Sequence, residues 1–354
     1  MTLKDLGITK EISNYLKENK LSDFTVGRVT QEHRESYIVS TGEKEYHAEI
    51  TGNLRFTATS RADFPAVGDW VTMIVYDSDL AIIHKILPRI SVLERQMVGK
   101  PGEKQIISTN VNVAFIIQSV GNNFNINRLQ RYMTICYSAD IEPVLIISKI
   151  DLATDEEIRD AVDILESRDK KIKYFLLSNM TRHGLDQIAD FIVKGQTYCI
   201  LGSSGTGKST LINNLLNKEI LKTGAISRST NKGRHITEHR ELFILKNGGI
   251  IIDTPGMREL GLTDDDEGIN TTFQDIQKIA MRCKFHDCKH INEEGCAVIE
   301  AFNKGEINGE SLENFRKLQK EQERFIITAA ERHKKERQFG RIMKDYKKIM
   351  KKNN

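Results

Sequence analysis

One glycine-rich segment has the residue types and the spacing of a phosphate-binding loop. It fits the pattern Gly-x4-Gly-Lys-Ser, follows an apolar run and opens a helical pattern. Glycines let backbone N–H groups turn inward around phosphate oxygens, and the N-terminus of the helix faces the same anion. Lys208 brings positive charge to the terminal phosphates, where it would also assist catalysis, and Ser209 offers a hydroxyl to Mg²⁺. We expect nucleotide phosphates at Gly202, Ser203, Ser204, Gly205, Thr206, Gly207, Lys208, Ser209 and Thr210.

A second segment of the same chemistry follows about fifty residues later. Asp253 ends an apolar run and begins the sequence Asp-Thr-Pro-Gly. A carboxylate at the end of a strand can hold the Mg²⁺ shell, and the N–H of Gly256 can approach a terminal phosphate. Many GTPases place a water-orienting Gln at the next position, which here is Met257. Because methionine cannot orient water, we expect slow intrinsic hydrolysis unless another residue supplies that function.

The segment Ser148-Lys149-Ile150-Asp151 has the pattern of a guanine-binding loop. The carboxylate of Asp151 can accept both N–H protons of a guanine edge, a pattern that adenine lacks, and Lys149 would lie along the base plane. The usual first residue of this motif is Asn, so Ser148 predicts a retained guanine preference with looser affinity. Ser178 and Asn179 follow an apolar run and suit a second loop against the base.

The order of these motifs is unusual. The guanine-binding loop at Asp151 precedes the phosphate loop at Lys208, whereas an ordinary GTPase has the phosphate loop first. The sequence therefore predicts a circularly permuted GTPase domain.

Three cysteines and one histidine cluster within fourteen residues. Three thiolates and one imidazole form a complete tetrahedral set with no open position, which predicts a single structural Zn²⁺. By sequence alone, His286 competes as a ligand. The remaining cysteines, Cys136 and Cys199, lie in apolar runs and are expected to be inert core thiols. The clustered residues are Cys283, Cys288, His290 and Cys296.

The secondary-structure elements that must position these residues change in type along the chain. Short alternating runs between Asp23 and Glu94 predict about five strands in a small barrel of the OB type. Beyond Gly99–Gly102, which is typical of a linker, apolar strands alternate with helical segments and indicate a parallel sheet covered on both faces. We expect an N-terminal OB-fold barrel with a leading helix at 1–98, an α/β P-loop GTPase domain at 99–270, and a zinc-binding helical domain at 271–354.

Composition limits the class of protein and its partners. The chain has 354 residues and a net charge of +3, and its 39% hydrophobic and 29% charged residues fit a globular protein without membrane spans. Residues 311–354 hold 14 basic and 6 acidic residues, against 38 and 43 elsewhere. Such a basic tail indicates a polyanionic partner, although a solvated surface helix explains it equally well.

The first thirty residues lack the apolar centre of a signal peptide, so we expect a cytoplasmic protein. No exposed heptad pattern suggests a dimer, so we expect a monomer.

Together these features resemble the RsgA/YjeQ family, the circularly permuted GTPases that assist maturation of the small ribosomal subunit. The resemblance extends over nearly the whole chain and includes Val67–Val71, Ile86–Arg89, Gly233–Thr237 and the cysteine cluster. It implies that the zinc ligands are Cys283, Cys288, His290 and Cys296.

The resemblance also implies roles for residues of the switch. It implies that His235 takes part in catalysis and that Thr237 senses Mg²⁺ and the γ-phosphate. Ile236 and Glu238 stand where the family often has Thr, so switch packing is expected to differ, and His239 could substitute for His235.

The resulting hypothesis is a GTPase that binds the small ribosomal subunit and its rRNA. GTP would favour the bound state, and hydrolysis stimulated by the subunit would release the protein. Two alternatives remain at this point. The first is a nucleotide-gated rRNA-binding module with little catalysis, which Met257 favours because it cannot orient water. The second is a P-loop ATPase or small-molecule kinase, which the phosphate loop alone would also fit.

Overall fold

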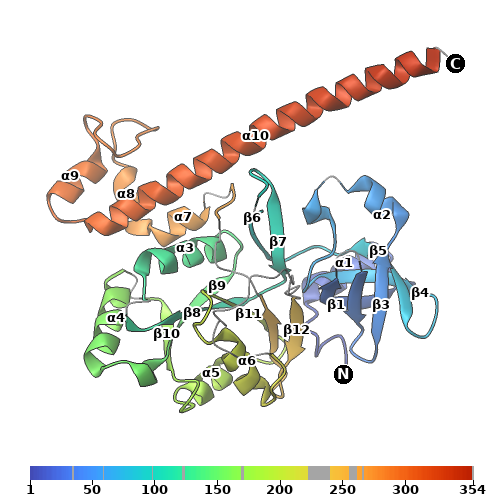
Figure 1. Ribbon diagram of the computed structural model, residues 1–354, viewed down its shortest axis with the longest axis horizontal. Helices are drawn as coiled ribbons and strands as arrows, with labels where there is room; N and C mark the ends of the chain where they lie inside the picture. The colour runs from blue at the N-terminus through green and yellow to red at the C-terminus, as the bar shows by residue number, and fades with distance from the viewer. Residues whose placement is uncertain are drawn as a thin grey trace, which may run out of the picture. The chain divides into compact units, whose positions relative to one another are not determined.

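The structure, a computed structural model, describes residues 1–33, 36–58, 60–97, 99–121, 124–168, 171–221, 240–254, 261–264 and 267–352. The chain divides into two compact units. The first comprises Met1–Glu94 and Ile106–Glu259 and contains a barrel and a mainly parallel sheet. The second comprises Arg95–Gln105 and Leu260–Asn354, joining a hairpin tip to the C-terminal helices. Figure 1 shows the elements of each unit.

The N-terminal region is a closed five-stranded barrel, as predicted. Its strand order is β1-β2-β3-β5-β4, and β4 pairs again with β1 to close it. Alternating apolar residues such as Val29, Val39, Val71 and Ile83 fill the interior. A short helix α1, Lys10–Glu18, is capped by the Thr9 side chain. The strands are β1 (Thr25–His33), β2 (Ser36–Ser40), β3 (Glu45–Ile50), β4 (Trp70–Val75) and β5 (Leu80–Ile86), with α2 (Gly52–Thr57) and η1 (Arg61–Asp63) between β3 and β4.

Two short motifs of the barrel, Val67–Val71 and Ile86–Arg89, meet in the structure. Arg89 donates to both carboxylate oxygens of Asp69 at 2.8 and 2.7 Å, and Asp69 also accepts from the backbone of Ala66. Asp69 is completely buried. Because a buried carboxylate is stable only when paired and hydrogen-bonded, this bidentate pair fixes the loop that enters β4.

The mainly parallel sheet, in which the sequence predicts the nucleotide site, has the order β10-β9-β8-β11-β13-β12. The neighbours from β10 to β13 pair in parallel, and β12 alone among these six strands runs antiparallel to its neighbour β13. The central strands β8, β9 and β11 are almost wholly buried because helices cover both faces, as the sequence predicted, whereas β10 and β12 are only partly buried. The strands are β8 (Val113–Ser119), β9 (Glu142–Ser148), β10 (Lys173–Leu177), β11 (Thr197–Gly202), β12 (Glu241–Ile244) and β13 (Ile250–Asp253).

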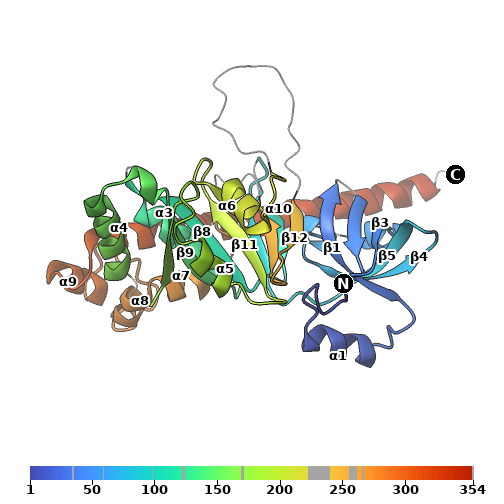
Figure 2. The ribbon, with the colours of Figure 1, turned by 90° about the horizontal axis from the view of Figure 1, so that it is seen from below.

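The helices divide between the two faces of this sheet (Figures 1 and 2). Helices α5 (Leu185–Phe191) and α6 (Lys208–Leu216) pack against Phe115, Ile146 and Ile200. Helix α3 (Ile126–Tyr137) contacts β8 and β9 on the opposite face, and α4 (Asp155–Arg168) links β9 to β10. Cys136 and Cys199 are both completely buried, and burial raises the pKa of the Cys199 thiol to about 12. They are therefore inert core thiols, as predicted.

The barrel and the sheet are joined edge to edge within the first unit. Strand β1 of the barrel pairs with β12 of the sheet at Gln31 and Glu241. The Gln31 amide donates to the Glu241 carboxylate at 2.7 Å. The eleven strands from β10 to β4 therefore form one continuous hydrogen-bonded sheet.

The segment interpreted from sequence as a linker forms a turn instead. Residues Gly99–Gly102 lie between β6 (Val92–Gln96) and β7 (Lys104–Thr109), which pair as a two-stranded sheet. Gly99 and Gly102 both have positive φ, 77° and 75°, a conformation that glycine adopts without strain. The conformational freedom of Gly and the fixed φ of Pro thus serve a hairpin turn here rather than an extended connection.

The C-terminal unit is helical. Its core includes the aromatic pair Phe273 and Phe315, whose rings are tilted by 59° with centroids 5.4 Å apart. Leu312, Phe315, Leu318 and Phe325 are buried on one face of the last helix, as their spacing predicted, but Ile326 is 42% exposed. The helices are α7 (Glu267–Thr272), α8 (Gln274–Ala280), α9 (Ala297–Asn303) and α10 (Gly309–Lys352). Within the ranges that the structure describes, no helix has the length and hydropathy needed to cross a membrane.

Candidate functional site

The topology places the predicted nucleotide-binding residues at one edge of the sheet. Because their strands are parallel, the carboxyl ends meet at the same edge. Ser148 ends β9, Gly202 ends β11, Asp253 ends β13, and Ser178 follows β10. The order of the motifs along the chain is reversed, but their order across the sheet brings them together.

The phosphate loop has the backbone that its glycines predict. Gly202 has φ of 145°, and a Cβ there would lie 2.4 Å from the carbonyl oxygen of Ile117. Gly205 and Gly207 also have positive φ. The Lys208 ammonium donates to the carbonyls of Gly202 and Ser203 at 2.8 and 2.7 Å, so its charge lies over the loop. The helix that follows, α6, begins at Lys208 and directs its positive N-terminus toward the loop.

The guanine-binding segment divides into a buried and an exposed half. Ser148 is completely buried, whereas Asp151 lies exposed in the short 3-10 helix Ile150–Leu152. Between them Lys149 has φ of 62°, in the left-handed region, which turns the chain from the strand out to the surface. Ser178 is buried and accepts from the backbone of Thr181 at 3.1 Å, closing the second loop.

Part of the predicted switch lies outside the described residues. Asp253 is placed at the end of β13, next to Thr254, whose hydroxyl donates to the carbonyl of Ile200 in β11. This bond holds the end of β13 against the strand that carries the phosphate loop. The positions predicted for His235, Thr237 and Gly256, together with His239 and Met257, fall at 222–239 and 255–260, which the structure does not describe.

Two residues at the site were missed from the sequence. The Tyr132 hydroxyl of α3 bonds the side chain of Ser203, and burial raises the pKa of Tyr132. Asn214 of α6 donates its amide to both oxygens of Asn179, at 3.3 and 3.2 Å. Neither residue belongs to a motif of the site. Tyr132 reaches the loop from α3, and Asn214 lies in α6, the helix that follows the loop, so the fold rather than a motif brings them to the site.

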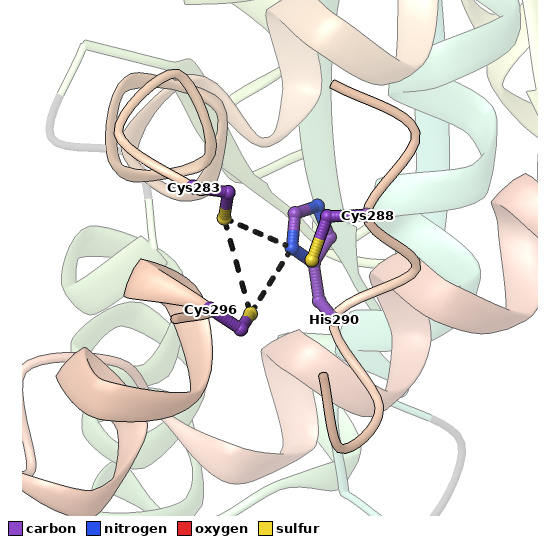
Figure 3. Close-up of side chains that lie close together, drawn as sticks. All are labelled: Cys283, Cys288, His290 and Cys296. Atoms are coloured by element: carbon purple, nitrogen blue, oxygen red, sulfur yellow. Dashed lines mark hydrogen bonds between the residues drawn. The ribbon is translucent and has the colours of Figure 1, made fainter. Parts of the chain in front are cut away.

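The four predicted zinc ligands converge in the C-terminal unit (Figure 3). Their ligand atoms all lie within 4.8 Å of one another. His290 Nδ1 is 3.5 Å from both Cys283 Sγ and Cys296 Sγ, and the two sulfurs are 3.9 Å apart. A tetrahedron with Zn–S bonds of about 2.3 Å and a Zn–N bond of about 2.0 Å has edges of roughly 3.5–3.8 Å. The spacing therefore fits a zinc ion, and His286 is not part of the cluster.

The chemistry of the donor set also favours a cation. Burial and the neighbouring thiols raise the pKa of Cys288 to about 11, so its thiolate form needs a compensating charge. Burial lowers the pKa of His290 and keeps its imidazole neutral, as a metal ligand must be. The carbonyl of His290 accepts from the Arg316 guanidinium of α10. The Glu293 carboxylate accepts from the backbone of Lys289, Ile291 and Asn292, which orders the loop between the ligands.

Comparisons with known proteins agree with this arrangement. A family profile described as RsgA GTPase matches residues 86–263, half of the chain. A "Small ribosomal subunit biogenesis GTPase RsgA 2" from Lactiplantibacillus plantarum is 43% identical, with 84% of this chain and 83% of the relative covered. An RsgA 1 of the same description from Bacteroides thetaiotaomicron is 36% identical over 96% of this chain and 93% of the relative. The chain belongs to the RsgA GTPase family.

Solved structures show the same fold. YjeQ from Thermotoga maritima superposes with a TM-score of 0.62 at 24% identity, covering 84% of this chain and 98% of that one. YloQ, described as a circularly permuted GTPase, superposes with a TM-score of 0.60 at 22% identity over 85% and 95%. A further profile, described as 50S ribosome-binding GTPase, matches only 197–337, starting at the strand before the phosphate loop. The protein is therefore a GTPase with a permuted nucleotide-binding domain, and the ATPase or kinase alternative is excluded.

Proposed function

We propose that this GTPase binds the small ribosomal subunit and assists its late maturation, with subunit-stimulated hydrolysis driving release. The observation that supports this most strongly is the similarity, along almost the full chain, to relatives described as small ribosomal subunit biogenesis GTPases. The permuted order supports a coupling role. It places the barrel immediately before the guanine-binding half of the domain and the C-terminal unit immediately after the strand that ends at Asp253.

We propose the following roles at the nucleotide, which are supported by the meeting of these residues at one edge of the sheet. Asp151 accepts from the guanine, with Lys149 beside the base and Ser178 in the facing loop. The backbone of the phosphate loop holds the phosphates and Lys208 neutralises them. Ser209, Asp253 and Thr237 would hold Mg²⁺, which supplies charge neutralisation at the β- and γ-phosphates when bound. Gly256 would contact the terminal phosphate.

For hydrolysis, we propose His235 as the residue that assists the attacking water. Met257, at the usual position of a water-orienting Gln, has no group that can hydrogen-bond water. An imidazole in the switch can supply that contact, and His239 is the second choice. Intrinsic turnover is then slow, and docking on the subunit would order the switch.

The two ends of the chain provide the proposed contacts with rRNA. The zinc ion is structural, since four protein ligands leave no open position. It stabilises loops with a small core and presents α10, whose sequence carries the basic excess. A barrel of the OB type gives a second nucleic-acid platform. We further propose boundaries near 98 and 270, and a cytoplasmic monomer.

The test is GTP turnover with and without purified small ribosomal subunits. The proposal predicts a stimulation of at least about 100-fold by small subunits, comparable in kind to a GTPase completed by its activating partner. No stimulation, or equal stimulation by large subunits, would contradict it. Binding to small subunits that depends on GTP without any stimulated turnover would favour instead the nucleotide-gated rRNA-binding module.

A further inference from the structure

Two side chains of the guanine-binding half hold consecutive carbonyl groups of the phosphate loop. The Ser148 hydroxyl donates to the carbonyl of Thr206 at 2.8 Å. The Asn179 amide donates to the carbonyl of Gly207 at 3.1 Å. Both donors precede the loop in sequence, one at the end of β9 and the other after β10. They connect the two halves that the permutation separates.

The burial of Ser148 determines what it can contact. Its side chain has no exposed surface, so it cannot touch a base in the nucleotide site. The carbonyl of Gln118 is a second acceptor at 3.3 Å, but the single hydroxyl proton favours the shorter bond to Thr206. Ser148 therefore acts on the nucleotide only through the backbone of the phosphate loop.

Asn179 is oriented for the same purpose. Asn214 donates to the Asn179 side-chain oxygen at 3.2 Å, which turns the Asn179 amide nitrogen toward the loop. Gly207 permits the approach, because a Cβ at that position would lie 2.7 Å from the Asn179 nitrogen. A larger residue at 207 would push the amide away.

The geometry of the peptide unit connects these bonds to phosphate binding. A trans peptide is planar, so its N–H points away from its C=O. The carbonyl of Thr206 shares a peptide with the N–H of Gly207, and the carbonyl of Gly207 shares one with the N–H of Lys208. Fixing the two carbonyls toward the guanine-binding loops therefore aims the two N–H groups in the opposite direction.

We propose that Ser148 and Asn179 are positioning residues that aim the N–H groups of Gly207 and Lys208 at the phosphates of the nucleotide. Discrimination between purines belongs to Asp151, whose carboxylate is exposed at the neighbouring surface. Ser148 thus supplies a hydrogen bond to the phosphate loop from the position where the motif usually has Asn. This inference deepens the proposed function and rests on its nucleotide site.

The experiment measures dissociation constants for GDP and IDP by calorimetry on the full-length protein, without ribosomal subunits. IDP lacks the exocyclic amino group of guanine, so the GDP-to-IDP ratio reports contact with the base. Ser148→Ala and Asn179→Ala should each weaken the binding of GDP and of IDP by the same factor, roughly fivefold for the loss of one net hydrogen bond. The ratio should stay at its wild-type value, whereas Asp151→Asn should reduce it.

Further variants separate the hydrogen bond from packing. Ser148→Cys keeps the shape of the side chain, but its larger thiol donates only weakly, so the loss of affinity should be at least that of Ser148→Ala. Ser167→Ala in α4 and Asn19→Ala at the C-cap of α1 remove similar exposed side-chain-to-backbone bonds and should leave both affinities unchanged. Thermal unfolding without nucleotide identifies any variant that has lost its fold.

Three results would overturn the proposal. They are unchanged affinities in both Ser148→Ala and Asn179→Ala, an altered GDP-to-IDP ratio in either, or full affinity in Ser148→Cys. Since no ribosomal subunit is present, these results are independent of subunit-stimulated turnover. A failure of the proposed function would leave this outcome unaffected.

Discussion

Arg28 in strand β1 of the barrel donates from Nη1 to the hydroxyl of Thr197, the first residue of β11, at 3.0 Å. The same guanidinium donates to the carbonyls of Leu6, Gly68 and Asn110. Arg28 is 1% exposed, and burial lowers the pKa of its guanidinium to about 9, partly offset by Asp69. One buried cation thus holds the N-terminal segment, the barrel and the strand that leads to the phosphate loop.

Replacing Arg28 with Met should destabilise the first unit by about 3 kcal/mol or more, because several buried acceptors lose their donor. Thr197→Val removes only one acceptor, and Arg28 Nη1 can still donate to the carbonyl of Leu6. This variant should therefore lower the free energy of unfolding by about 1 kcal/mol. Urea unfolding measures both. Arg159→Met is the control, since Arg159 is exposed and donates to Asp155 on the surface of α4. An equal loss of unfolding free energy in Arg28→Met and Arg159→Met would show that the buried network contributes little to stability.

Lys208→Ala should reduce GTP turnover by at least about 100-fold, because charge neutralisation at the phosphates is lost. Zinc content, measured by plasma emission spectroscopy, should stay at one per chain, since the cluster lies in the other unit. Lys218→Ala is the control, because it removes a lysine just beyond the C-terminal end of α6, the helix that begins at Lys208. Turnover that survives in Lys208→Ala would contradict the assignment of the phosphate loop.

Cys296→Ser should lower the zinc content well below one per chain. The cluster would lose one of its three sulfurs, whereas the Ser hydroxyl can still cap α9 by accepting from the backbone of Ile299. Affinity for small subunits should fall before nucleotide affinity changes, because the cluster belongs to the C-terminal unit. His286→Ala is the matched control and should retain full zinc. Loss of zinc in that variant would restore His286 as a ligand.

Gly102→Val should separate the hairpin tip from α10. A Cβ at Gly102 would lie 2.9 Å from the backbone nitrogen of Ala329, and φ there is 75°. Gly99→Val is a close control, since φ is 77° and nothing lies within 4 Å of its Cβ. Both variants have the same backbone strain, about 1–2 kcal/mol, but only the Gly102→Val side chain would collide with α10. Amide exchange around Ala329 should rise in Gly102→Val alone, and an equal rise in both would exclude the contact.

The sequence by itself determined the chemistry and most of the elements. Motif spacing identified the phosphate loop through Lys208 and the cluster around Cys296, because backbone geometry and metal coordination each require particular residues at short range. Periodicity located the barrel strands and the alternation of strands and helices, since burial on one face or both leaves a local pattern. The reversed motif order was equally visible.

Only the tertiary structure decided how distant residues combine. It made Gly99–Gly102 a hairpin turn, because Gly and Pro occur in linkers and in tight turns alike, and only the pairing of β6 with β7 distinguishes the two. It placed Arg28 against Thr197, 169 positions apart. Above all it changed the meaning of Ser148, which lies buried and bonded to the phosphate loop. A motif specifies residue types along the chain, but the partner of a buried donor is set by whichever acceptor the packed sheet brings within hydrogen-bond distance.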